Sequence, residues 1–197
     1  GQVHASVDAN RRRQIRANHT ATHILHKILR DQLGSHVAQR GSLVAPDRLR
    51  FDFSHGESIP SQTLKVIERL ANDAVAAALV VDIAEKPINE ARELGAMMLF
   101  GEKYGDVVRV VSVGGEYSRE FCGGTHVTNT SEIGIIKIVG ESSSAAGVRR
   151  IEAITSDGAM EYIAKTISDA ERAASLLNVK VDGLSGAIQR FLDERQH

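Results

Sequence analysis

Two pairs of potential metal ligands, far apart in the chain, constrain its fold more than any other sequence feature. His19 and His23 stand four residues apart in a stretch with helical periodicity, so both imidazoles are expected on one helix face. Cys122 and His126 have the same spacing, but the two glycines between them predict a tightly folded loop. If the two pairs share one ion, this helix and this loop must meet in the folded protein.

The donor set of one thiol and three imidazoles suits Zn²⁺. Two histidines alone are more typical of a half-buried helix face, and a single cysteine is often a small buried hydrophobe. It is the pairing of both halves that favours ligation. Thr20 argues against a metalloprotease helix, which needs Glu directly after the first His. His26 falls on nearly the same face and is expected behind the ligands or in the core. We predict one Zn²⁺ per chain, held by His19, His23, Cys122 and His126.

Composition narrows the classes of protein. With 197 residues, 42% of them hydrophobic, the chain can bury a sizeable core. Its 24 basic and 25 acidic residues nearly balance, so any nucleic-acid binding must come from local patches. The sequence has no apolar run of transmembrane length and no apolar signal segment. Its single cysteine rules out an intramolecular disulfide and fits a reducing compartment, so we expect a cytoplasmic protein without a membrane partner.

Hydrophobic periodicity predicts an α+β fold. Helices are expected up to Gly34, over 61–79, over 89–98, and beyond about 156 with a break at 179–183. Strands are expected over 37–44, 49–54, 80–88, 107–115, 133–141 and 148–155, with a polar loop over 116–132. The weak alternation of Val3, Ala5 and Val7 predicts a short strand or the end of one. This order favours an antiparallel or mixed sheet with packed helices and a helical C-terminal tail over a βαβ succession.

Five motifs occur in the order seen in alanyl-tRNA synthetases: His19-Thr-Ala-Thr-His23, RGSLV with RFDFSH, FGEKYGD, CGGTH, and GVRRIEAITSDGA. The chain therefore resembles the editing domain of a bacterial-type enzyme over residues 3–160. The threonyl-tRNA synthetase editing domain shares the four-ligand pattern, but GVRRIEA and FGEKYGD fit the alanyl family better. The resemblance implies the end of a β-barrel linker at 1–10, an editing domain at 11–160, and at 161–197 the start of a C-terminal helical region that oligomerises in many members.

In that family, the editing site hydrolyses the ester between a wrong amino acid, Ser or Gly, and the tRNA for alanine. An activation pocket sized for Ala cannot exclude Gly and rejects Ser only weakly, so a second site must destroy the wrong product. The resemblance maps the family's site residues onto Thr22, Gln39 and Ser42, which could recognise the serine hydroxyl. Read without it, Thr22 can bond its own helix turn, and the other two can lie on the solvent face of a strand.

The resemblance implies tRNA as a partner, and guanidinium groups suit its phosphates. Arg149 and Arg150 follow a small-residue loop that could admit the RNA 3′ end, and Lys103 could face the terminal nucleotide. Four more basic residues precede the metal helix, although charge runs are usually solvated faces; they are Arg11, Arg12, Arg13 and Arg16. The rest of a synthetase chain and a second copy, bound through the C-terminal tail, are further expected partners.

Other functions stay open at this point. A free-standing editing deacylase would use the same motifs, although a start inside a strand and a helix cut at His197 favour an excised piece. A non-catalytic, zinc-stapled module would bind tRNA without hydrolysis. A purely structural zinc domain would unfold on metal loss and have no RNA affinity. Four protein ligands close a zinc site, so a catalytic role needs one of them, most plausibly Cys122, to be loose or replaced by water.

Overall fold

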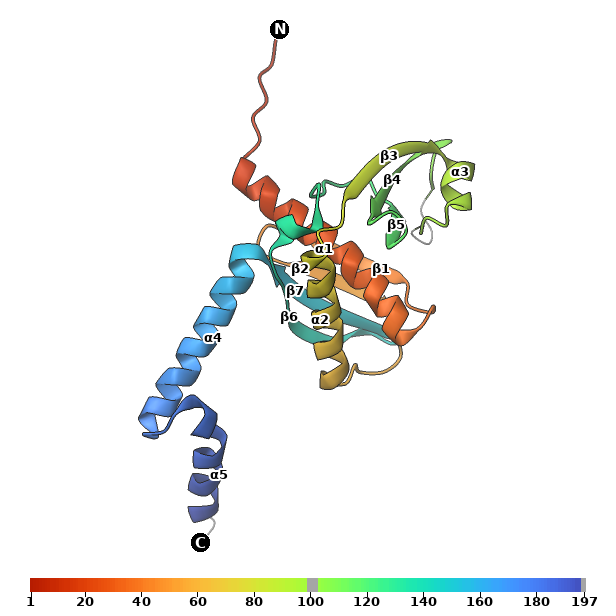
Figure 1. Ribbon diagram of the computed structural model, residues 1–197. Helices are drawn as coiled ribbons and strands as arrows, with labels where there is room; N and C mark the ends of the chain where they lie inside the picture. The colour runs from red at the N-terminus through yellow and green to blue at the C-terminus, as the bar shows by residue number, and fades with distance from the viewer. Residues whose placement is uncertain (99–102, 196–197) are drawn as a thin grey trace. The chain divides into compact units, whose positions relative to one another are not determined.

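The computed structural model describes residues 1–98 and 103–195. The chain divides into two compact units, Gly1–Ser156 and Asp157–His197, and each is described by itself. The first unit contains two β-sheets with packed helices (Figure 1). Every ladder between the named strands of the described chain is antiparallel. The predicted α+β class is confirmed, in its antiparallel form.

Helix α1 (Ala9–Leu33) carries the first pair of candidate ligands. Asp8 caps it by accepting a hydrogen bond from the Arg11 backbone N at 2.9 Å, and the helix ends at Gly34, whose φ of 118° favours glycine. The predicted strand around Val3 is wrong: residues 1–8 form no strand, and Val3 is 92% exposed. A weak alternation without a partner strand does not form a β-ladder. Helix α1 begins at Ala9, two residues before the arginine run.

The larger sheet has the strand order β1-β2-β7-β6. Its strands are β1 (Gln39–Val44), β2 (Leu49–Ser54), β6 (Ile136–Ala145) and β7 (Val148–Thr155). Helices α1 and α2 (Ser61–Ala76) lie side by side across this sheet (Figure 1). Phe51 and Phe53 on β2 are fully buried against the helices, with ring centroids 5.8 Å apart. This core fixes α1, and with it the two histidines, relative to the sheet.

The smaller sheet has the order β3-β4-β5, with β3 (Val81–Pro87), β4 (Val107–Val113) and β5 (Ser118–Phe121). The short helix α3 (Ile88–Glu93) follows β3 and ends five residues before the predicted end. Strand β5 corrects the predicted loop over 116–132, because Gly114 and Gly115 turn the chain back so that β5 pairs with β4. The 3-10 helix η1 (Thr130–Ile133) occupies the start of the strand predicted from 133.

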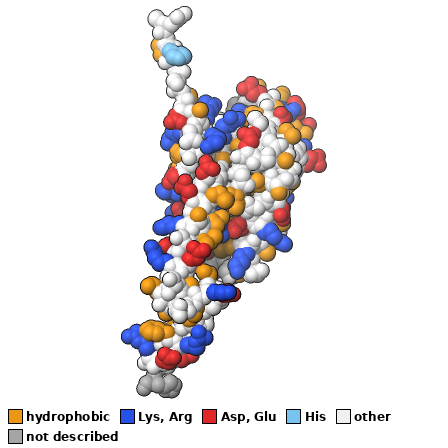
Figure 2. Space-filling view, turned by 60° about the vertical axis from the view of Figure 1, so that its left-hand side comes forward, with side chains coloured by type: hydrophobic (Ala, Val, Ile, Leu, Met, Phe, Trp, Pro, Cys, Tyr) orange, Lys and Arg blue, Asp and Glu red, His pale blue; other side chains and the backbone are white. Residues whose placement is uncertain are grey.

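The second unit is helical, as predicted. It comprises most of α4 (Ser156–Leu176), the 3-10 helix η2 (Val181–Gly183) and α5 (Leu184–Glu194). On α5, Ile188, Phe191 and Leu192 are 43–49% exposed and share one helix face. Hydrophobic and charged side chains alternate over the C-terminal end of the chain (Figure 2). Among the described helices, none combines the length and the apolar character needed to cross a membrane.

Candidate metal centre

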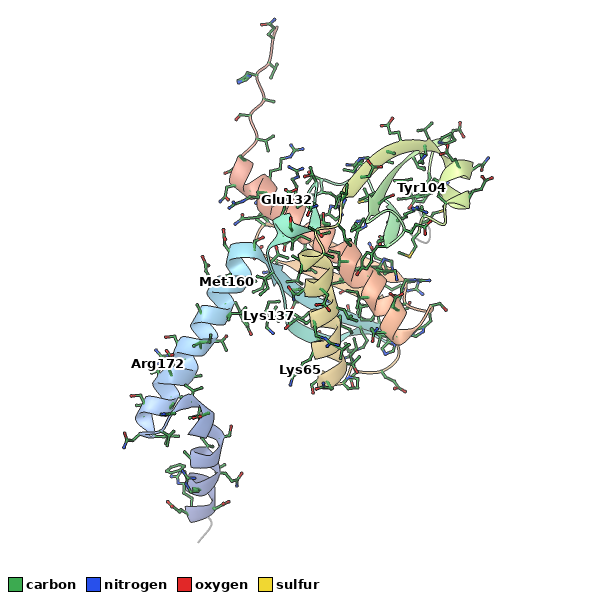
Figure 3. The ribbon with its side chains drawn as sticks, viewed as in Figure 1. Lys65, Tyr104, Glu132, Lys137, Met160 and Arg172 are labelled. Carbon is green, nitrogen blue, oxygen red and sulfur yellow. The ribbon has the colours of Figure 1, made fainter. Side chains whose placement is uncertain are left out.

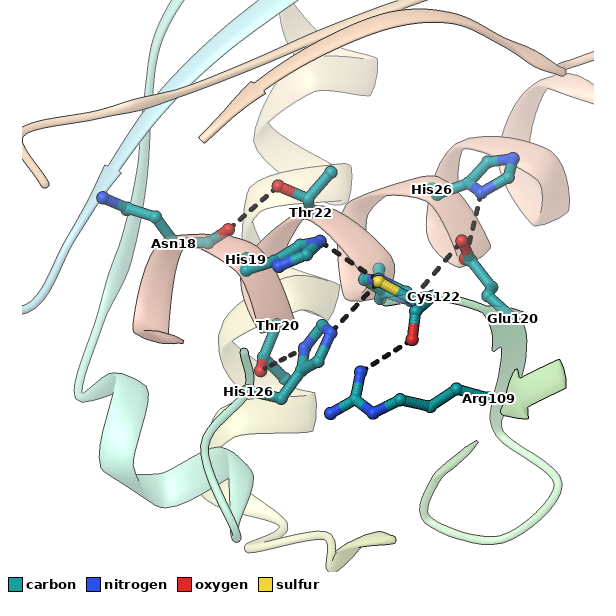
Figure 4. A network of polar contacts seen from close by, with 10 residues as sticks. Asn18, His19, Thr20, Thr22, His26, Arg109, Glu120, Cys122 and His126 are labelled. Carbon is teal, nitrogen blue, oxygen red and sulfur yellow. Dashed lines mark hydrogen bonds and ion pairs between the residues drawn. The ribbon is translucent and has the colours of Figure 1, made fainter. Parts of the chain in front are cut away.

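Four potential ligands meet where α1 contacts the chain that follows β5. The ligand atoms of His19, His23, Cys122 and His126 all lie within 4.8 Å of one another. Cys122 Sγ is 3.4 Å from His19 Nε2 and 3.3 Å from His126 Nε2 (Figure 4). Tetrahedral bonds of about 2.3 Å to S and about 2.0 Å to N separate S from N by about 3.5 Å. The cluster therefore has the spacing and the donors to hold a metal ion.

The imidazoles are held in the uncharged form that binds metal. Burial, with the charge of His23, lowers the pKa of His19 to about 4. Burial, with the charges of His23 and His19, lowers the pKa of His126 to about 2. Burial also outweighs the charge of Glu120 and lowers the pKa of His23. At neutral pH, each ring has a free nitrogen lone pair, and binding needs no prior loss of a ring proton.

Two arginines hold the segment Cys122–His126 in place. Arg109 of β4 donates from one nitrogen to the carbonyls of Cys122 at 2.7 Å and Gly124 at 2.6 Å. Arg16 of α1 donates through Nε to the carbonyl of His126. The two ligands of this segment are thus anchored from the sheet and from the helix. Arg109 gave no signal in the sequence, because it lies inside a valine-rich strand whose partners the sequence does not name.

Thr20, which lies between His19 and His23, contacts the candidate ligand His126. Its buried Oγ1 lies 3.1 Å from His126 Nδ1 and accepts a hydrogen bond from the Val127 backbone N at 3.2 Å. The contact leaves His126 Nε2 facing the sulfur of Cys122. In the sequence, Thr20 indicates only that this is not a metalloprotease helix. Its position between the two histidines was the signal that could have identified it.

The predicted site residues lie at different depths. Thr22 is buried on α1, and its hydroxyl donates to the Asn18 carbonyl at 2.9 Å, which is the local bond that the sequence allowed. Gln39 is half-buried at the start of β1, and Ser42 is exposed on the same edge strand. In residues 1–98 and 103–195, no hydrogen bond joins the side chain of Gln39 or Ser42 to the four ligands. The roles of all three residues stay predictions.

Of the three residues predicted to contact RNA, the two arginines form ion pairs within the protein and Lys103 is exposed. The neighbour of Lys103, Tyr104, labelled in Figure 3, packs edge-on against Phe121, with ring centroids 5.1 Å apart. The first three residues of this motif, 100–102, lie outside the described residues. Arg149 pairs with Glu141 of β6. Arg150 forms two hydrogen bonds to Asp52 of β2, at 2.7 and 2.8 Å.

The chain is similar to known proteins over nearly its whole length. Residues 108–152, which include Cys122 and His126, match the threonyl and alanyl tRNA synthetase second additional domain. The alanine–tRNA ligase of Geobacillus kaustophilus (strain HTA426) is 49% identical over 199 aligned residues, covering 98% of this chain and 22% of that protein. This chain is homologous to the second-additional-domain region of alanyl-tRNA synthetases. The resemblance predicted from the motifs is confirmed.

Other alanyl-tRNA synthetases give the same result. The alanine–tRNA ligase of Exiguobacterium sibiricum is 52% identical over 95% of this chain and 21% of its own length. That of Nitrobacter winogradskyi is 49% identical over 96% of this chain and 23% of its own length. The chain thus spans less than a quarter of these synthetases. The candidate metal centre lies inside the shared region.

Proposed function

We propose that this chain acts in post-transfer editing as part of an alanyl-tRNA synthetase, hydrolysing the ester of Ser-tRNA(Ala) and Gly-tRNA(Ala). One observation carries the proposal. A compact set of three imidazoles and one thiol is assembled in a chain about half identical to alanine–tRNA ligases. The rest of the synthetase chain is the covalent partner that positions the tRNA. The expected location is the cytoplasm, where tRNA is charged.

The proposed cofactor is one Zn²⁺ per chain, held by His19, His23, Cys122 and His126. Imidazole and thiolate suit this ion, whereas Mg²⁺ and Ca²⁺ prefer oxygen ligands. Zn²⁺ would supply Lewis-acid polarisation of a water molecule or an anchor for the amino group of the substrate. The protein's part is to hold three uncharged Nε2 atoms and one sulfur in fixed positions. Arg16 and Arg109 serve this by donating hydrogen bonds to the backbone carbonyls of Cys122, Gly124 and His126.

We assign recognition of the serine hydroxyl to Thr22, Gln39 and Ser42. Thr22 Oγ1 donates to Asn18, so its lone pairs stay able to accept the proton of a serine hydroxyl. An alanyl ester has no hydroxyl to make these bonds, and a polar group that the bound substrate buries without a partner costs about 1–3 kcal/mol. A glycyl ester also lacks the hydroxyl, so Gly and Ala should be separated less well than Ser and Ala.

We assign contacts with the tRNA backbone to Lys103, Arg149 and Arg150. Lys103 is exposed and carries a full positive charge to the surface. The two arginines have carboxylate partners, so a phosphate would have to share their guanidinium groups with Glu141 and Asp52. A second copy of the chain is the proposed partner for the exposed apolar face of α5.

Deacylation of seryl- and alanyl-tRNA(Ala) tests this function, with His19→Ala beside the natural chain. Faster hydrolysis of the seryl ester, lost in the variant, is the expected result. A chain that binds tRNA but hydrolyses no ester, even after the rest of the synthetase is added, would instead be a non-catalytic zinc-stapled module. Hydrolysis that does not become faster when the rest of the synthetase is added would favour a free-standing deacylase. Full hydrolysis by metal-free protein would overturn the direct role of the metal.

A further inference from the structure

A buried carboxylate lies directly behind the metal ligands. Glu120 of β5 is only 7% exposed, and its two carboxylate oxygens face two histidines of α1. Figure 4 shows its contact with one of them, His26. Its Oε2 is 3.4 Å from His23 Nδ1, and its Oε1 is 3.0 Å from His26 Nδ1. A carboxylate is costly to bury unless hydrogen bonds or opposite charges compensate for its lost hydration. Glu120 is thus placed for interaction with these two rings.

The orientation of the candidate ligand histidines indicates what the contact between Glu120 and His23 does. His19 and His126 both turn Nε2 toward the sulfur of Cys122. His126 is held in that orientation by Thr20 at its Nδ1. His23 turns Nδ1 toward Glu120 instead, and among the described residues that buried nitrogen has no hydrogen-bond partner. The Nε2 of His23 is therefore the nitrogen left for a metal ion, and Glu120 is the acceptor that its Nδ1–H faces.

His26 has a feature that packing alone does not explain. The ring is 5% exposed and lies against Phe51, with centroids 5.1 Å apart, in a place where an apolar side chain would pack well. Its Nε2 is buried without a hydrogen-bond partner in the described part of the chain, which destabilises the fold. Its Nδ1 contacts Glu120. An imidazole here gives the carboxylate a donor that a phenyl ring could not provide.

We propose that His26 and Glu120 are positioning residues for the metal ligand His23. The Nδ1–H of His26 donates to Oε1 of Glu120 and fixes the carboxylate. When a metal is bound, Oε2, which lies 3.4 Å from His23 Nδ1, would accept the Nδ1–H and hold this ring in the tautomer that presents Nε2 to the metal. Hydrogen bonds of this kind orient metal-bound histidines and make them better donors. The inference rests on the metal site of the proposed function, but not on its hydrolytic reaction.

Metal affinity of the purified chain tests the proposal, measured by competition with a chelator for Zn²⁺ and by absorption for Co²⁺. Glu120→Gln keeps the size of the side chain but removes its charge and one acceptor. We expect its affinity for both ions to fall about 10–100-fold. The thiolate-to-cobalt absorption band should persist, because all four ligands remain. Glu116→Gln is the matched control, since the side chain of Glu116 is 91% exposed; it should bind like the natural chain.

Two substitutions of His26 separate positioning from packing. The side-chain amide N–H of His26→Asn can replace the Nδ1–H, so this variant should retain most of the affinity. His26→Phe fills the space but cannot donate, so its affinity should fall as in Glu120→Gln. The melting temperature of each metal-free variant shows whether it folds.

The outcomes distinguish the proposal from the function it rests on. Unchanged affinity in Glu120→Gln, or equal affinities of the Asn and Phe variants, would overturn the positioning role alone. A natural chain that binds neither Zn²⁺ nor Co²⁺ would overturn the metal centre, and the positioning role with it. A chain that binds metal but hydrolyses no ester would overturn only the proposed reaction, and the affinities would still decide the roles of Glu120 and His26.

Discussion

Gly124 approaches His19 so closely that a β-carbon at position 124 would lie 2.0 Å from Cε1 and 2.4 Å from Nδ1 of the imidazole. Real β-carbons do not come this close to a ring, so either the ring or the backbone would have to move. The segment that carries Cys122 and His126 can pass over His19 only because this position has no side chain. Its neighbour Gly123 has open space around it.

The substitution Gly124→Ala should therefore weaken metal binding while Gly123→Ala does not. The added methyl displaces His19 or the segment 122–126, and one misplaced ligand of four should reduce Zn²⁺ affinity at least about tenfold, or about 1.4 kcal/mol. Competition with a chelator measures the affinity of both variants. Neither glycine has a positive φ, so alanine adds no backbone strain of its own at either position. Equal affinities would mean that the contact with His19 does not restrict the site.

The sequence could predict the four candidate ligands because each pair is local. His19 and His23 need only one helix, and Cys122 and His126 only one loop, so spacing and residue type were enough. The groups that orient these ligands come from long-range pairing. Glu120 and Arg109 reach the cluster only because β5 pairs with β4 and lies against α1, and residue spacing does not encode that contact.

The missed strand β5 has the same cause. Ser118–Phe121 is short and mostly polar, and Glu120 is buried for its contacts with histidines rather than for apolar packing. The pattern therefore predicted a loop. The opposite error occurred at Val3, where alternation predicted a strand that has no partner to pair with. Strands depend on partners, so isolated patterns mislead more for strands than for α1.

Two threonines that lie two residues apart on α1, Thr20 and Thr22, should respond differently to loss of their hydroxyls. Thr20→Val removes the group shared by His126 Nδ1 and the Val127 N–H, so the free energy of unfolding should fall by about 1–3 kcal/mol. Metal affinity should fall with it, because His126 loses its orientation. Denaturant unfolding and chelator competition measure the two effects. An unchanged affinity would show that the loop alone orients His126.

Thr22→Val loses only a bond to the carbonyl of its own helix, which contributes little to stability. We expect a folded protein with normal metal affinity that hydrolyses seryl-tRNA(Ala) more slowly and loses its preference for seryl over alanyl esters. The ratio of kcat/KM for the two esters is the measurement. A retained preference would assign hydroxyl recognition to other residues and leave Thr22 with its bond to Asn18.

Arg150 should contribute to stability in a pH-dependent way. Its hydrogen bonds, opposed by partial burial, keep the pKa of Asp52 below the ordinary value. A lowered carboxyl pKa stabilises the fold at pH values above the unfolded pKa of about 4, and this contribution is lost as pH falls through the folded pKa. Arg150→Gln should therefore lower the melting temperature at pH 7, and its difference from the natural chain should shrink below about pH 4.

The same variant separates two roles of this arginine. If Arg150 also contacts phosphate, tRNA binding by Arg150→Gln weakens and depends less steeply on salt. Arg48→Gln is the control, because Arg48 is exposed and pairs only with its neighbour Asp47 among the described residues. A lower melting temperature with unchanged tRNA affinity would show that Arg150 only stabilises the pairing of β2 with β7 and does not contact tRNA.

Removal of the metal should lower the melting temperature of the chain without unfolding it at 25 °C. The ion stabilises the folded state by mass action, about 2.7 kcal/mol at a free concentration one hundred times the Kd. The core around Phe51, Phe53 and Leu25 is fully buried without any contribution from a ligand, unlike the core of a small zinc finger. After a chelator has removed the metal, circular dichroism should show intact helices and a thermal transition at a lower temperature. His19→Ala is the control, since a chelator should not shift its transition further. Loss of the helical signal on chelation at 25 °C would instead identify a purely structural zinc domain.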